Sequence, residues 1–229
     1  RIAWGSSALL VIVGLLYTSN IALMLAPERW ADAYAPHGLN PQITLASLAR
    51  YAHVLVGALA VSGAFVVAYG LFARRTCAEY GSWVVRSGAL VVTAATAAQV
   101  TFGPAFLFSL PESSRRLFLG ADGLATSLVV AGVALAAVAA LLLLLAGRPG
   151  RGIALPVFGM ASLAGGVVAM VLARDVLRRH RLQPYVSEMA VQMQPLVLGL
   201  FFVALLATLT TLAWMLIRAL RPRTETYSA

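Results

Sequence analysis

Residues 123–146 read GLATSLVVAGVALAAVAALLLLLA, a run of 24 positions without a charged side chain. The hydrocarbon core of a bilayer is about 30 Å thick, and roughly 20 apolar residues in an α-helix cross it. A helix on the surface of a soluble domain needs a polar face, and this run has none. The stretch therefore predicts a transmembrane helix.

Five further runs on either side of this one have the same apolar character. The expected spans are 3–26, 48–73, 82–110, 153–173 and 195–217, in addition to 123–146. None of the six carries an acidic residue at its centre. The expected fold class is all-α: a polytopic integral membrane helix bundle with about six transmembrane helices, forming a single transmembrane domain over residues 1–229.

The overall composition excludes a soluble globular protein. Apolar residues make up 61% of the chain and charged residues only 11%, whereas soluble domains carry about 25% charged residues. A chain of 229 residues with so few polar side chains cannot build the polar surface that water requires. The lipid bilayer is therefore the first partner that the sequence predicts.

The basic residues indicate membrane topology rather than nucleic-acid binding. The net charge is +9, and all 17 residues counted as Lys or Arg are arginine. No basic–aromatic module accompanies them, so we expect no nucleic-acid partner. Six spans place both termini on one side, side A, together with the short arginine-bearing linkers around 74–75 and 148–151. By the positive-inside rule we expect side A in the cytoplasm of a bacterial inner membrane.

The opposite side, side B, has the longer linkers and all three histidines. These linkers, 27–47 and 174–194, carry mixed polar groups, which is where function tends to lie. We expect His37 and His180 in loops and His53 about a turn and a half inside the second span. An ionisable residue within a membrane helix is a functional candidate, and His is the usual axial ligand of haem iron.

The neighbours of His53 suit a haem. Gly57, Ala60 and Ala64 follow it on one helix face, where small side chains would let a porphyrin approach. Arg50 lies one turn earlier, at headgroup level, where its guanidinium could pair with haem propionates. The alternative is that the small residues serve close helix packing and that His53 only hydrogen-bonds a loop carbonyl.

Several residues at a plausible depth are candidates for a second axial ligand. They are His37, His180, Met24, Met189 and Met193. A Met ligand would raise the haem potential relative to a pair of His ligands. The chain cannot attach a c-type haem itself, because Cys77 is its only cysteine.

Residues 15–75 resemble subunit I of cytochrome bd quinol oxidases around its low-spin haem b ligand. The segment Arg50-Tyr51-Ala52-His53 is similar to the Arg-Phe-Ala-His segment of that family. The resemblance continues in 63–68 (GAFVVA) and, upstream, in 19–20 (SN), 24–27 (MLAP) and 38–41 (GLNP). It implies a haem b ligated by His53 near the periplasmic face and a quinol-binding region formed by the loop before this helix. The family's Gly-Arg-Gln-Pro-Trp motif and its membrane-embedded acids are missing, so the resemblance does not extend to oxygen reduction.

The first linker on side B also suits a quinone on chemical grounds. A quinone needs an apolar slot and polar groups for its carbonyl oxygens. Trp30 and Tyr34 supply aromatic surface at interface depth, and Asp32 and His37 could relay protons. The alternative is that the two aromatics belong to the interfacial belt of a membrane protein.

The function that these patterns predict is a membrane-embedded electron-transfer subunit, either a b-type cytochrome or the quinol-interacting anchor of a larger respiratory complex. Its partners would be other membrane subunits and a c-type cytochrome or iron–sulfur protein on the periplasmic side. No catalytic residue is assigned, so the chain would be a non-catalytic subunit of an oxidoreductase complex. The alternatives are a haem-free anchor for redox proteins and a small-molecule transporter, for which the spans offer few polar groups and no buried carboxylate.

Overall fold

The protein was analysed as a computed structural model that describes residues 2–33, 35, 44–148, 152–186 and 194–220. Every regular element in these ranges is helical. In chain order, the helices are α1 (Ile2–Met24), η1 (Pro27–Arg29), α2 (Trp30–Ala33), α3 (Leu45–Ala73), α4 (Ala78–Ser109), α5 (Glu112–Arg116), η2 (Leu117–Ala121), α6 (Gly123–Ala146), α7 (Ala154–Val186) and α8 (Pro195–Leu220).

Six of these helices, α1, α3, α4, α6, α7 and α8, are long and apolar enough to cross a membrane. The prediction of an all-α, multi-pass membrane protein with six spans is therefore confirmed. Most of the expected boundaries agree with the structure within a few residues. The exception is α7, which was expected to end near 173 and continues to Val186. Its extension includes His180, so the prediction that His180 lies in a loop is wrong.

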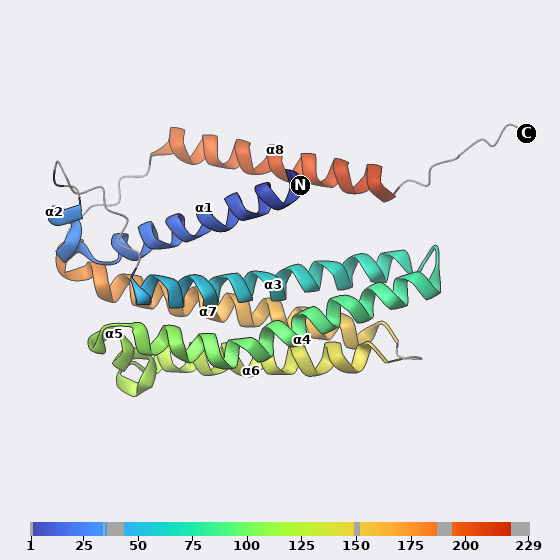
Figure 1. Cartoon of the computed structure of the whole chain (residues 1–229), viewed down its shortest axis with the longest axis horizontal. Coiled ribbons are helices and arrows are strands. Elements are labelled where there is room, and N and C mark those ends of the chain that lie inside the picture. Colours follow the sequence, from blue (N-terminus) through green and yellow to red (C-terminus); the bar gives the residue numbers. More distant parts are fainter. Residues whose placement is uncertain (1, 34, 36–43, 149–151, 187–193, 221–229) are drawn as a thin grey trace, which may run out of the picture. The chain divides into compact units, whose positions relative to one another are not determined.

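The chain divides into two compact units, residues 1–187 and residues 188–229. The second unit contains α8, an apolar helix with Arg218 in its last turn. Within the first unit, consecutive membrane helices run in opposite directions, and α3 lies along α4 as α6 lies along α7 (Figure 1). A further contact between α4 and α6 joins the two pairs.

The α3–α4 pair is held together by close backbone contact. A Cβ added to Gly88 of α4 would lie 2.7 Å from the carbonyl oxygen of Gly63 and from the backbone nitrogen of Val67. A Cβ on Gly70 would similarly lie 2.7 Å from the nitrogen of Val85. Only glycine fits at these crossings, and small residues that let backbones approach are typical of helix pairs in membranes.

The apolar core of the first unit lies between four helices. Its buried residues are Val67, Val85, Ala89, Val92, Ala139, Leu143 and Leu163, from α3, α4, α6 and α7. A second cluster on side B consists of Leu110, Phe118, Ala125, Ala173 and Leu177. The first cluster packs α3 against α4, and the second joins the side B ends of α4, α6 and α7.

The side B turn between α4 and α6 is closed by local hydrogen bonds. Asp122 caps α6 by accepting a 2.7 Å bond from the backbone nitrogen of Ala125, as a helix N-cap does. Gly120 has φ +113°, a conformation that favours glycine. Its backbone nitrogen donates to the Thr126 hydroxyl, 3.0 Å away. Local hydrogen bonds thus hold the turn at the start of α6.

Candidate cofactor site

His53 lies in the third turn of α3, where its side chain is half-buried against α4. Its ring stacks on Phe106, with 5.3 Å between the centroids and an interplanar angle of 26°. Gln99 also reaches it, because the Nε2 atom of Gln99 donates a 2.8 Å hydrogen bond to the backbone carbonyl of His53. Phe106 therefore packs against the imidazole, and Gln99 holds the backbone of His53.

Two polar atoms at this contact lack hydrogen-bond partners within the part of the chain that the structure describes. They are Nδ1 of His53 and Oε1 of Gln99, and both are buried. An unpaired polar atom that is buried away from water costs about 1–3 kcal/mol. Such atoms often mark a binding or catalytic role, so this contact is the strongest candidate for a site in the described helices.

Arg50 extends the site toward the membrane surface. Its guanidinium carbon lies 5.3 Å from the centroid of the Phe106 ring, on the ring face. Arg174 of α7 is close enough for the two positive charges to interact. Neither arginine forms an ion pair with a carboxylate in the described ranges. Phe106 thus contacts both His53 and Arg50, and two unneutralised cations lie beside them.

The small-residue face below His53 is occupied by α4. A Cβ added to Gly57 would lie 3.4 Å from Nε2 of Gln99, Ala60 is buried, and Ala64 packs against the apolar core. These residues serve close helix packing, which was the alternative to the expectation that they leave room for a porphyrin. A haem at His53 therefore cannot lie flat along this face without displacing α4.

Two of the other predicted iron ligands, Met24 and His180, lie in the described residues. Met24 and His180 are exposed, on α1 and α7 respectively. His37, Met189 and Met193 lie outside the described residues. Among the described residues, Phe106 stacks on the His53 ring and Gln99 bonds its backbone carbonyl, and neither is a usual haem ligand.

Half of the predicted quinone site can be located. Trp30 begins the short helix α2, and its indole Nε1 donates a 2.9 Å hydrogen bond to the carbonyl oxygen of Leu23. The indole N–H is therefore already used to fold the corner after α1. Asp32 is exposed on α2, and Tyr34 and His37 lie outside the described residues.

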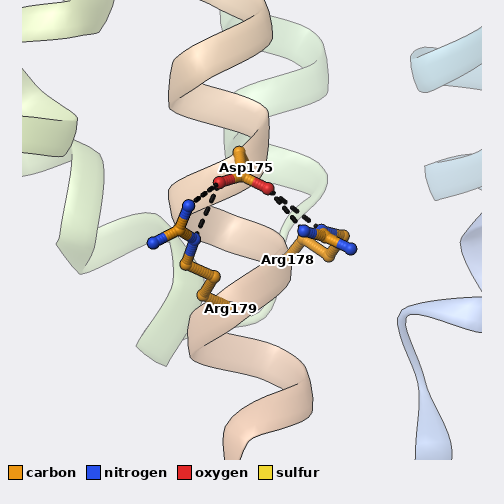
Figure 2. Close-up of polar contacts among 3 residues, drawn as sticks. All are labelled: Asp175, Arg178 and Arg179. Carbon is orange, nitrogen blue, oxygen red and sulfur yellow. Dashed lines mark hydrogen bonds and ion pairs between the residues drawn. The ribbon is translucent and has the colours of Figure 1, made fainter. Parts of the chain in front are cut away.

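The arginine-rich end of α7 forms an internal ion-pair network. The Asp175 carboxylate accepts 2.7 Å contacts from Arg178 through one oxygen and from Arg179 through the other (Figure 2). The pairs at i+3 and i+4 require a helix, so the helical interpretation of this segment is confirmed. Both arginines are otherwise exposed, as expected for a helix end at the headgroup level.

Arg181 ties this end of α7 to the corner after α1. Its Nη2 lies 2.8 Å from Oε1 of Glu28, and its Nε donates a 3.0 Å bond to the carbonyl of Leu25. A backbone hydrogen bond to the carboxylate, followed by the charge of Arg181, lowers the pKa of Glu28 below its usual value. Sequence positions 28 and 181 thus share one polar contact on side B.

Gln99 and Phe106 are the residues of the site that sequence reasoning did not assign. Gln99 is noticeable only as a polar side chain in an apolar span. The positions of the two residues along their helices could have paired them. His53 is the ninth residue from the side B end of α3, and Gln99 lies ten residues before the side B end of the antiparallel α4. Because both residues lie at a similar depth from side B, packing of α3 against α4 brings them together. Phe106 gives no such signal, because aromatics are common near the ends of membrane spans.

Comparison with known proteins adds no assignment: no protein-family model, curated protein or solved structure matches the chain.

Proposed function

We propose that this chain is a membrane-embedded electron-transfer subunit that binds haem b through His53 and receives electrons from quinol on side B. In this proposal side B faces the periplasm of a bacterial inner membrane, and a c-type cytochrome or iron–sulfur protein docks there. The observation that supports the proposal is the buried Nδ1 of His53 inside an apolar helix pair, which has no hydrogen-bond partner among the described residues.

The residues around His53 partly match what a haem requires. An imidazole supplies an axial ligand for iron, and Arg50 with Arg174 supplies positive charge for two propionates. Gln99 holds the His53 backbone and offers a free carbonyl oxygen to the ring, as the outer partners of metal-bound histidines do. A bound haem would accept and release single electrons. The Gly57–Ala64 face does not contribute, because α4 covers it.

The quinol part of the proposal rests on the first side B linker, which leads directly into α3. Asp32 is exposed there and could accept a proton when a quinol is oxidised. Quinol bound at this linker would be a short distance along the chain from the helix that carries His53. Trp30 would contribute ring surface only, since its N–H is bonded to Leu23.

A haem-free membrane anchor is the second candidate, and one observation favours it. The small residues next to His53 are used for packing against α4, which is what a purely structural helix pair needs. In that case the exposed side B residues, including Arg178 and Arg179, would form a docking surface for redox partners. The two candidates differ in whether the purified protein has a haem spectrum.

Reduction by dithionite and by a quinol distinguishes these possibilities. The wild-type protein, purified in mild detergent after expression with added haem precursor, should show Soret and α-band changes with dithionite. A quinol analogue should produce the same changes more slowly. The Asp32→Asn variant should be reduced by the quinol about 100-fold more slowly, the lower end of the range for loss of a general base, with an unchanged dithionite spectrum.

Glu112→Gln is the matched control, because Glu112 is an exposed carboxylate of side B in a different linker. It should leave both reductions unchanged. A folded wild-type protein without any spectral change would favour the haem-free anchor. An unchanged quinol rate in Asp32→Asn would remove the quinol site from this linker while leaving the haem proposal intact.

A further inference from the structure

A cavity of about 280 Å³ lies between α4 and α6 on side A, at the opposite end of the molecule's first unit from His53. It is lined by Arg86, Ala89, Leu90, Leu144, Gly147 and Arg148. Two of the six are arginines and the others are apolar or glycine. The cavity therefore combines a doubly charged end with an apolar wall.

No carboxylate of the described residues neutralises either arginine. The guanidinium groups of Arg86 and Arg148 form no ion pair there, and the 3.2 Å hydrogen bond from Arg148 to the Leu145 carbonyl at the end of α6 uses the backbone nitrogen and leaves the guanidinium free of it. The nearest acid on the same face of α4 is Glu79, two turns earlier and about 10 Å along the helix axis. Two guanidinium groups without a counter-ion beside one cavity favour an anion.

The backbone explains why the two arginines converge. Gly147 ends α6 with φ −70° and ψ −8°, and a Cβ built on it would lie 3.5 Å from Cγ of Arg86. The stem of Arg86 thus crosses the end of α6 directly beside Arg148. The exposed aromatics Trp83 and Tyr80 lie one and two turns further out on α4, which is typical of the membrane interface.

The depth and shape of the cavity point to a lipid rather than to a dissolved ion. Leu90 and Leu144 lie on the membrane side of the two arginines, and both are exposed apolar side chains. An acyl chain in contact with them would leave its phosphate at the level of Arg86 and Arg148. Basic pockets between membrane helices on the cytoplasmic side are known sites for anionic headgroups.

We propose that this cavity binds the phosphate of an anionic phospholipid between Arg86 and Arg148. Each guanidinium can donate paired hydrogen bonds to phosphate oxygens. The glycerol and acyl chains lie along Leu90 and Leu144. The site is independent of the haem proposal, because it involves other residues on the other side of the membrane.

Native mass spectrometry of the full chain in neutral detergent tests the proposal. The probes are dioleoyl-phosphatidylglycerol, dioleoyl-phosphatidylcholine and inorganic phosphate, each titrated separately. Phosphatidylglycerol should bind wild type in preference to phosphatidylcholine. The Arg86→Gln plus Arg148→Gln variant should bind it at least about tenfold more weakly, because charge-assisted bonds to both guanidinium groups are lost. Arg75→Gln plus Arg218→Gln, which removes two charges expected on the same side but outside the cavity, should change binding by less than about threefold.

A single substitution inside the cavity provides a second test in which both arginines are kept. The geometry at Gly147 accepts a side chain, so Gly147→Glu should place a carboxylate beside Arg86 and take the place of the lipid phosphate. It should weaken phosphatidylglycerol binding, whereas Gly147→Ala should not. Equal binding of the two lipids, unchanged binding in the double arginine variant, or inorganic phosphate binding as tightly as phosphatidylglycerol would overturn the proposal.

Discussion

The two halves of the α3–α4 pair use the same helices for different purposes. In the side A half, Gly63, Gly70 and Gly88 bring the backbones together, and Val67 and Val85 are fully buried. In the side B half, the same two helices enclose His53 and Gln99, each with a buried atom that has no partner among the described residues. The side A half is held by close apolar packing and has one such atom, Nε of Arg74, at its outer end, whereas the side B half places two at one contact between the helices.

This difference shows that the polar residues are not required to hold the helices together. Membrane helices associate by close packing of small residues, and the side A half already provides this. Keeping an imidazole and an amide buried without full hydrogen bonding costs stability. A sequence that needed only the helix pair could place apolar residues there. The side B half is therefore where we expect a ligand.

The largest expected effect comes from breaking the packed half. In Gly88→Ala the new Cβ would meet backbone atoms of Gly63 and Val67 at 2.7 Å, and rigid backbone cannot move aside as a flexible side chain can. We expect a loss of about 1–3 kcal/mol in the free energy of unfolding, the range typical of overpacking. Unfolding by sodium dodecyl sulfate in mixed micelles measures it.

Gly5→Ala is the control for this prediction, in the membrane helix α1. A Cβ at Gly5 has no atom within 4 Å, so the variant should be unchanged or more stable by up to about 1 kcal/mol, the helix-propensity difference. If both variants unfold alike, the close contact of α3 and α4 in the packed half is not what stabilises the pair.

A smaller effect is expected from altering the polar half. Gln99→Leu removes the amide that holds the His53 carbonyl and whose oxygen is free to accept from the ring. If His53 ligates haem, loss of such an outer partner should weaken haem retention by about 10- to 100-fold and shift the midpoint potential. Haem loss to an excess of apomyoglobin and a redox titration measure the two quantities.

Gln99→Glu and Thr93→Val are the comparisons for that variant. The first keeps an acceptor oxygen but loses the N–H that donates to the His53 carbonyl, so it should retain more haem than Gln99→Leu and less than wild type. The second removes a hydroxyl of α4 that bonds the carbonyl of Ala89, away from His53, and should change neither quantity. Haem retention and potential as in wild type for Gln99→Leu would show that Gln99 does not position His53.

The smallest expected effect concerns the contact of Arg181 with Glu28. Because the pKa of Glu28 is lowered on folding, the ion pair stabilises the protein above the unfolded pKa and is lost as pH falls through the folded pKa. Arg181→Gln should cost less than about 1 kcal/mol near neutral pH, since Glu28 is largely exposed. Below about pH 4 the difference from wild type should shrink.

Thermal unfolding in detergent across this pH range measures the effect. Arg115→Gln is the matched control, because Arg115 lies on side B without a carboxylate partner among the described residues. Its difference from wild type should not depend on pH. A pH-independent difference for Arg181→Gln would mean that its bond to the Leu25 carbonyl, and not the ion pair, carries the stabilisation.

The sequence was sufficient for the fold because one physical requirement dominates it. Spans of about 20 apolar residues must be helical in lipid, and this placed all six helices. The predicted end of α7 was wrong, because Arg178 and Arg179 suggested that the helix stops before them. The helix continues because Asp175 pairs with both and because the polar end can lie in the headgroup region.

The site was less predictable because it depends on which faces of α3 and α4 meet. Helical spacing placed Gly57, Ala60 and Ala64 on one face with His53, and the structure shows that this face packs against α4. The role of Gln99 follows from the same contact. Periodicity along one helix identifies a face but does not say what covers it, so packing and cofactor binding could not be separated.

The haem content of wild type and of His53→Ala, purified side by side, tests the central claim most directly. The pyridine haemochrome assay measures haem b per chain, and size-exclusion chromatography with circular dichroism checks that both proteins are folded. His180→Ala is the control, because His180 is exposed on α7. We predict haem b in wild type and in His180→Ala and its loss from His53→Ala. A folded wild type without haem b, or equal haem b in His53→Ala, would contradict the assignment.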